Sequence, residues 1–80
     1  MTKEQFYQRY KEVIYEPYTE AWAIMKTLKE ADLTKDSVWK DYFDKCNEFE
    51  KKYPSEIGGS IYRVMLDCGS ECKRILDEQV

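Results

Sequence analysis

Apolar and aromatic residues recur at helical spacing through the first third of the chain, on both sides of a proline. They are Phe6, Tyr10, Val13, Ile14, Ala21, Ile24, Met25 and Leu28, with Pro17 inside the series. Steps of three and four residues place side chains on one face of an α-helix, where a neighbouring helix can cover them. The pattern therefore predicts one long first helix, over residues 3–31, with its apolar face in the core.

Pro17 leaves two interpretations of this helix open. A proline removes one backbone donor, and its ring clashes with the carbonyl four residues earlier, here that of Val13. Either the helix continues with a kink at Pro17, or it stops near Tyr15 and restarts with Pro17 in its first turn. The unbroken apolar spacing favours the kink. At the start of the helix, Thr2 and Gln5 have the spacing of a capping box.

A second helix is predicted over residues 35–53. Thr34 is a favourable N-cap residue, and Pro54 ends the helix because it disfavours helical geometry at Tyr53. The predicted apolar face consists of Trp39, Tyr42, Phe43, Cys46, Phe49 and Tyr53. On the opposite face, ion pairs are expected four residues apart, in Lys40–Asp44, Asp41–Lys45 and Glu48–Lys52.

A third helix is predicted over residues 57–78. Its apolar face is Ile57, Ile61, Val64, Met65, Cys68, Cys72, Ile75 and Leu76. Ser55 or Ser60 is a candidate cap. Gly58 and Gly59 lie between the two serines, and they are either part of the helix or a hinge or tight turn.

Eighty residues with three glycines and two prolines allow few turns, so few and long elements are expected. Short connections place neighbouring helices antiparallel. The sequence thus predicts a single domain over residues 1–80. Its fold class is all-α, an antiparallel three-helix bundle with a long, Pro-kinked first helix.

Charge and hydropathy exclude several classes of protein. The formal net charge is -3 and no basic stripe is present, so direct nucleic-acid binding is not expected. The sequence has no apolar run of about 18 residues to span a membrane, and no secretory signal follows Met1. Three cysteines without such a signal indicate free thiols in the cytoplasm.

The sequence gives little support for a catalytic function. The chain has no histidine, the commonest general base and metal ligand, so no catalytic residue is assigned and the protein is predicted not to be an enzyme. Cys46, Cys68 and Cys72 lack the C-x-x-C spacing of metal sites. Core packing is the preferred interpretation, with metal, redox or intermolecular disulfide roles as alternatives. No metal or cofactor is expected.

Two other local patterns have simple structural interpretations. The carboxylates Asp41, Asp44 and Glu48 align along the second predicted helix, as a row of phosphates would, but each has a lysine four residues away. A solvated, ion-paired face is therefore favoured. The Gly58-Gly59-Ser60 segment precedes a helix but lacks the lysine and the spacing of a phosphate-binding loop.

Two aromatic patches are the candidate partner-binding residues. Tyr15, Tyr18 and Trp22 lie on a flank of the first helix, away from the centre of its core face. On the third helix, Tyr62 and Leu66 are expected to point away from the core, with Gly69 on the same side. A glycine inside a helix often marks a close approach. The alternative is that these aromatics only border a small core.

The leading hypothesis is a small non-enzymatic protein-binding module that docks on a larger protein as an adaptor or inhibitor. Its size and acidity would suit an accessory protein of a phage or mobile element, for instance an inhibitor of a host defence nuclease. The partner is unidentified, and a homodimer through Tyr62, Leu66 and Gly69 is a further possibility. The alternatives are a DNA mimic or helix-turn-helix reader, and a thiol or metal-binding helical protein.

Overall fold

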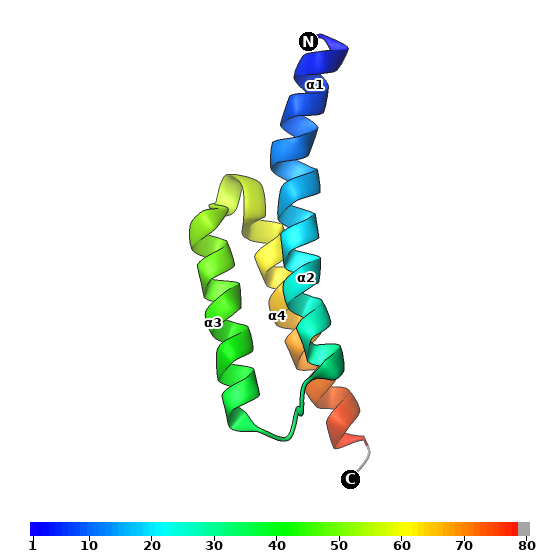
Figure 1. The fold of residues 1–80 in the computed structure, drawn as a ribbon, viewed down its shortest axis with the longest axis vertical. Helices are drawn as coiled ribbons and strands as arrows, with labels where there is room; N and C mark the ends of the chain where they lie inside the picture. The colour runs from blue at the N-terminus through cyan, green and yellow to red at the C-terminus, as the bar shows by residue number, and fades with distance from the viewer. Residues whose placement is uncertain (79–80) are drawn as a thin grey trace.

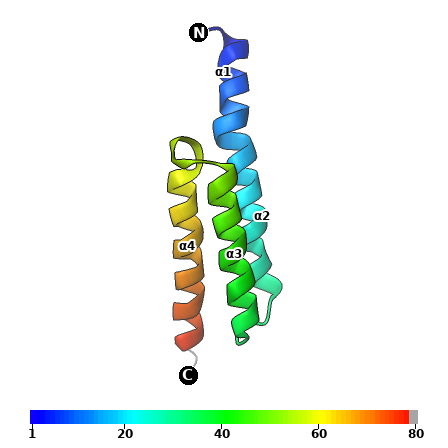
Figure 2. The same ribbon diagram turned by 90° about the vertical axis from the view of Figure 1, so that its left-hand side faces the viewer.

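The computed structural model describes the backbone of residues 1–78 and the side chains of residues 1–54 and 60–78. The described chain is all-α. Its elements are α1 (Lys3–Tyr10), the π-helical turn η1 (Lys11–Tyr15), α2 (Glu16–Glu30), α3 (Asp36–Lys52) and α4 (Ser55–Asp77). The first three form one long helix, which with α3 and α4 makes a three-helix bundle. In Figures 1 and 2 the chain descends through α2, returns through α3 and descends again through α4.

Local sequence signals explain where several helices begin and end. The predicted capping box is confirmed: the Thr2 hydroxyl accepts from the Gln5 amide at 3.1 Å, and the Thr2 amide donates to the Gln5 side chain at 2.9 Å. At the end of α3, Tyr53 before Pro54 is extended, as predicted. Gly58 and Gly59 lie within the bounds of α4, so their interpretation as a turn was wrong.

Two predicted helix caps were wrong. Thr34 does not cap α3, because its hydroxyl and amide both donate to the Asp32 carboxylate, at 2.6 and 3.1 Å. The N-cap position is Lys35 instead. At α4 the N-cap position is Pro54, so that Ser60 lies inside the helix.

The core lies where α2, α3 and α4 run side by side. Its buried apolar residues are Ala21, Leu28, Trp39, Tyr42, Cys46, Phe49, Ile61 and Met65. The predicted apolar face of α3 is confirmed, since its remaining members Phe43 and Tyr53 also pack against this cluster. On α4 the prediction holds in part: Val64 and Ile75 are exposed, while Ile57 is outside the described side chains.

Pro17 is buried, and it follows a π turn rather than a break. The Glu16 amide donates to the Lys11 carbonyl five residues earlier, and Tyr15 and Glu16 keep helical dihedral angles. The helical backbone therefore does not stop near Tyr15, although Pro17 does lie in the first turn of α2, and the kink stays a prediction. A π turn is wider than an α turn. It gives the Val13 carbonyl room to avoid the proline ring.

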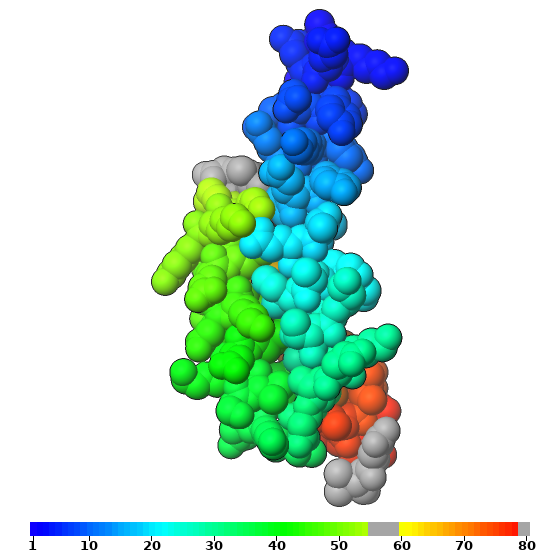
Figure 3. All heavy atoms as spheres, in the orientation of Figure 1, coloured from blue at the N-terminus to red at the C-terminus, as the bar shows by residue number. Residues whose placement is uncertain are grey.

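The apolar face predicted for the first half of the long helix is not in the core. Phe6, Tyr10 and Ile14 are all exposed, and α1 contains no buried residue. The physical reason is length: α3 and α4 do not reach α1, which stands clear of the bundle at one end in Figures 1 and 3. The molecule measures 54 × 21 × 18 Å as a result.

A polar cluster fixes the end of α3 to α2. Glu20 accepts from the Tyr53 hydroxyl at 2.7 Å and from the Lys52 ammonium at 3.0 Å. Partial burial opposes ionisation of Glu20, but these two hydrogen bonds outweigh it and lower the pKa of its carboxyl. Lys52 thus pairs with Glu20 rather than with Glu48.

Of the other ion pairs predicted along α3, the pair between Lys40 and Asp44 forms, with 3.5 Å between nitrogen and oxygen. No helix within residues 1–78 combines the length and the apolar character that crossing a membrane requires.

Candidate protein-binding surface

Seven large apolar residues of the long helix remain between 37% and 62% exposed. They are Phe6, Tyr7, Tyr10, Ile14, Tyr15, Tyr18 and Trp22, and together they are called the aromatic flank here. Single exposed apolar side chains are common on protein surfaces, but contiguous groups mark interaction sites. Whether these seven form one surface depends on how they are arranged around the helix.

The π turn brings the aromatic flank onto one side of the helix. At about 100° per residue, an uninterrupted α-helix would spread these seven side chains over about 180°. The π turn accommodates one additional residue, which turns everything after it back by about 100° relative to α1. Tyr18 and Trp22 then line up with Tyr7 and Tyr10, and the five flank residues outside the π turn occupy an arc of about 100°.

Three shallow grooves are lined in part by residues of the aromatic flank. The first, on the projecting part, is lined by Tyr7, Tyr10, Lys11 and Tyr15. The second lies between α2 and α4 and is lined by residues that include Tyr18, Met25 and Val64. The third, here called the lower groove, lies further along α2 and α4, and its lining includes Trp22, Met25, Lys26, Lys29, Cys72 and Ile75. The aromatic flank therefore continues into the surface between two helices of the bundle.

The structure places Tyr15, Tyr18 and Trp22, three of the predicted partner-binding residues, on this flank. All three are more than half exposed. Phe6, Tyr7, Tyr10 and Ile14 were not among the predicted site residues. Their signal in the sequence was the mismatch in length between the first predicted helix and the two shorter ones, which leaves one end of the long helix uncovered.

The second predicted patch faces its own chain. Tyr62 and Leu66 pack against the core, so the expectation that they point away from it was wrong. The Tyr62 hydroxyl donates to the Asn47 side chain at 2.9 Å. The predicted close approach at Gly69 exists, but inside the fold: a Cβ there would lie 3.2 Å from a ring carbon of Tyr42. A role for this patch in partner binding stays a prediction.

The three cysteines are free thiols. Cys46 is fully buried, whereas Cys68 and Cys72 are half-buried. Burial raises the pKa of the Cys46 and Cys72 thiols, so the reactive thiolate is disfavoured at both. Among the described residues, no three cysteine or acidic side chains lie close enough together to hold a metal ion.

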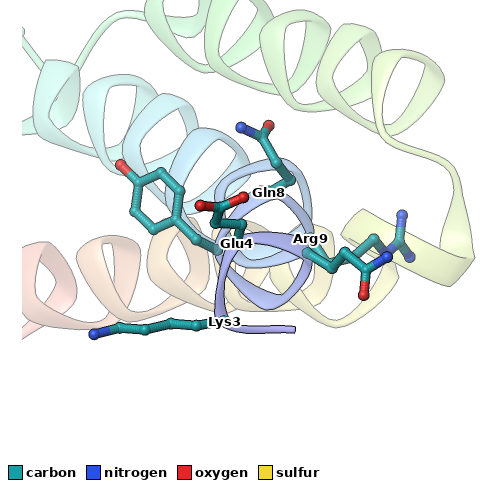
Figure 4. A pocket seen from close by; sticks show the side chains of 6 residues that line it. Lys3, Glu4, Gln8 and Arg9 are labelled. Atoms are coloured by element: carbon teal, nitrogen blue, oxygen red, sulfur yellow. The ribbon is translucent and has the colours of Figure 1, made fainter. Parts of the chain in front are cut away.

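A concavity at the tip of α1 offers no enclosed site. Residues of this one helix line it, and Figure 4 shows Lys3, Glu4, Gln8 and Arg9 spreading in different directions around the turn. All four are exposed. A ligand there would meet charged side chains from one side only, whereas ligand pockets enclose most of their ligand.

No family model, no curated protein and no solved structure matches this chain.

Proposed function

We propose that this protein is a small, non-enzymatic protein-binding module that docks on a larger protein through its aromatic flank. The observation that carries the proposal is the exposure of seven large apolar side chains along one helix. Tyrosine and tryptophan dominate binding hot spots because they bury a large area and keep a polar group for the rim. Five of the seven residues are of these two types.

The projecting position of the flank also supports docking. α1 contains no buried residue, and its eight residues are too few for a stable helix in isolation. The capping box and the continuous backbone from α2 support its helical shape. An aromatic helix that stands clear of its own bundle can lie in a groove of another protein.

The narrower role expected from the sequence stays part of the proposal. In that role the protein is an accessory factor of a phage or mobile element, acts in the cytoplasm, and inhibits a host defence nuclease by covering a surface of it. Three free thiols suit a reducing compartment. An adaptor that joins two proteins would use the same flank.

The test is affinity capture with the purified chain, followed by calorimetric titration of the captured protein. Tyr10→Glu and Trp22→Ala remove aromatic surface from exposed positions, and Gln8→Glu is the matched control on the other side of α1. Each flank variant is expected to weaken binding about tenfold or more, the effect of a typical hot-spot residue, while the control binds like wild type. Equal binding by all variants would exclude the flank as the docking surface.

A further inference from the structure

The aromatic flank connects two surfaces of different kinds. On α1 and η1 it lies on a single projecting helix, where its apolar side chains include Tyr7 and Tyr10. At Trp22 it meets the lower groove, which has an apolar floor between α2 and α4 and the side chains of Lys26 and Lys29 in its lining. Neither lysine takes part in the ion pairs found within the described residues.

A helix that combines exposed apolar side chains with a carboxylate would complement the apolar floor and the lysines of the lower groove. α1 has both features. Its Glu4 precedes Tyr7 by three residues, and residues three apart are neighbours on a helix surface. Glu4 is exposed and is likewise outside the ion pairs of the described residues. Within one molecule α1 cannot reach this groove, because both belong to the same continuous helix.

A second copy can fill the groove by symmetry. The projecting α1 and the lower groove belong to the same molecule, so each of two copies can offer both to the other, as a two-fold, self-complementary interface requires. With the axis between Glu16 and Pro17 and the helices antiparallel, Glu4 of one copy lies level with Lys29 of the other. Lys3 then lies level with Glu30, so both charge pairs are of opposite sign.

The same register matches the apolar residues. Tyr10 of one copy comes within one residue of the level of Trp22 of the other, and Tyr7 within one residue of Met25. The partner's α1 would then lie along α2 and α4 as a fourth helix of the bundle.

The available area is sufficient for a specific dimer. A buried aromatic side chain covers about 150–250 Å², so the roughly half-exposed rings of the flank offer about 600 Å². Ile14, Val64 and Ile75 are also exposed, and the latter two line the second and the lower groove. Together these residues approach the roughly 800 Å² per partner of a standard interface.

We infer that, in the absence of a larger partner, two copies of this chain pair antiparallel, each placing α1 in the lower groove of the other. The inference rests on the proposed function, because it names the protein that covers the same flank. Self-association thereby hides the docking surface, and a larger partner must compete with the second copy.

Charge reversal with reciprocal rescue tests this pairing. Sedimentation equilibrium is measured for wild type, Glu4→Lys, Lys29→Glu and an equimolar mixture of the two variants, with Gln8→Lys as the matched control on the other side of α1. Wild type is expected to reach twice its mass of 9.7 kDa at high micromolar concentration. Each single variant should dissociate about fivefold more readily, because each dimer loses two pairs and gains two like-charge contacts.

The mixture should recover the wild-type mass, since the lysine introduced by Glu4→Lys in one chain then meets the glutamate introduced by Lys29→Glu in the other. A monomer at every concentration overturns the dimer, and single variants that weaken it without recovery in the mixture overturn this pairing. A monomeric wild type that still binds a larger protein through Tyr10 and Trp22 leaves the proposed function standing. If substitutions at those two residues do not affect capture of a larger protein, the proposed function is wrong, whatever mass the wild type shows.

Discussion

At the scale of single residues, Gly69 of α4 packs closely against the aromatic side chains of α3. Gly69 leaves room for the ring of Tyr42, and the Tyr42 hydroxyl donates to the Met65 carbonyl at 2.5 Å. The sequence indicated a close approach from a glycine in mid-helix. It did not indicate the partner, because a helical pattern shows which residues share a face but not which neighbour covers that face.

Tyr42 has a consequence for stability at high pH. Burial, with the nearby Cys46 and Cys68 thiols, raises the pKa of this phenol far above its ordinary value of 10.0. At a pH below this ordinary pKa, the Tyr42 phenol is protonated in both the folded and the unfolded chain. Its contribution to the free energy of unfolding is then fully present. Above it the unfolded chain releases the proton while the folded chain retains it, so stability falls as the pH rises.

The free energy of unfolding of wild type should therefore fall by about 1.4 kcal/mol per pH unit for each such group above its ordinary pKa. Cys46 adds to the loss from about pH 9, because burial raises the pKa of its thiol also. Urea unfolding at a series of pH values measures this. Tyr42→Phe should cost about 1 kcal/mol at neutral pH but show a shallower alkaline decline. If the free energy of unfolding fell equally steeply with pH in wild type and Tyr42→Phe, Tyr42 would not be the source of the alkaline loss. Tyr7→Phe, at an exposed position, is the control.

At the scale of elements, the π turn decides how the long helix presents its side chains. The sequence predicted the extent of this helix closely, as residues 3–31 against Lys3–Glu30. It did not predict the π turn, because apolar spacing across Pro17 is compatible with a continuous α-helix. The exposure of Phe6 and Tyr10 was equally beyond prediction from spacing, since it depends on whether another helix extends that far.

Pro17→Ala should remove the cause of the π turn. An alanine supplies the missing amide and relieves the clash with the Val13 carbonyl, so residues 11–15 are expected to become α-helical. Tyr7 and Tyr10 would then rotate by about 100° relative to Trp22, and the aromatic flank would split. Self-association should weaken about tenfold while helix content is retained.

Backbone carbon chemical shifts and sedimentation together measure these two effects. Thr19→Ala, at an exposed position on α2, is the control. An α-helical turn with undiminished self-association would show that the alignment of the flank does not matter.

At the scale of the whole molecule, the long helix extends beyond the core of the three-helix bundle to which it belongs. The bundle buries the side chains that hold α2, α3 and α4 together, and α1 carries apolar residues beyond it. The fold class followed from the sequence because helical periodicity is strong in all three helices. The proposed binding surface followed only in part, through Tyr15, Tyr18 and Trp22, because its residues on α1 are exposed only since α3 and α4 do not reach them.

If another protein chain covers the aromatic flank, as proposed, Trp22 can report it directly. The chain has two tryptophans, of which Trp22 is 58% exposed and Trp39 is 8% exposed. Fluorine-labelled tryptophan gives one resonance for each, and a Trp22→Phe variant assigns them. As the concentration of the pure protein rises from low to high micromolar, the Trp22 resonance should shift while that of Trp39 stays in place. If neither resonance moves, with the protein alone or after addition of a captured partner, the flank is not a binding surface.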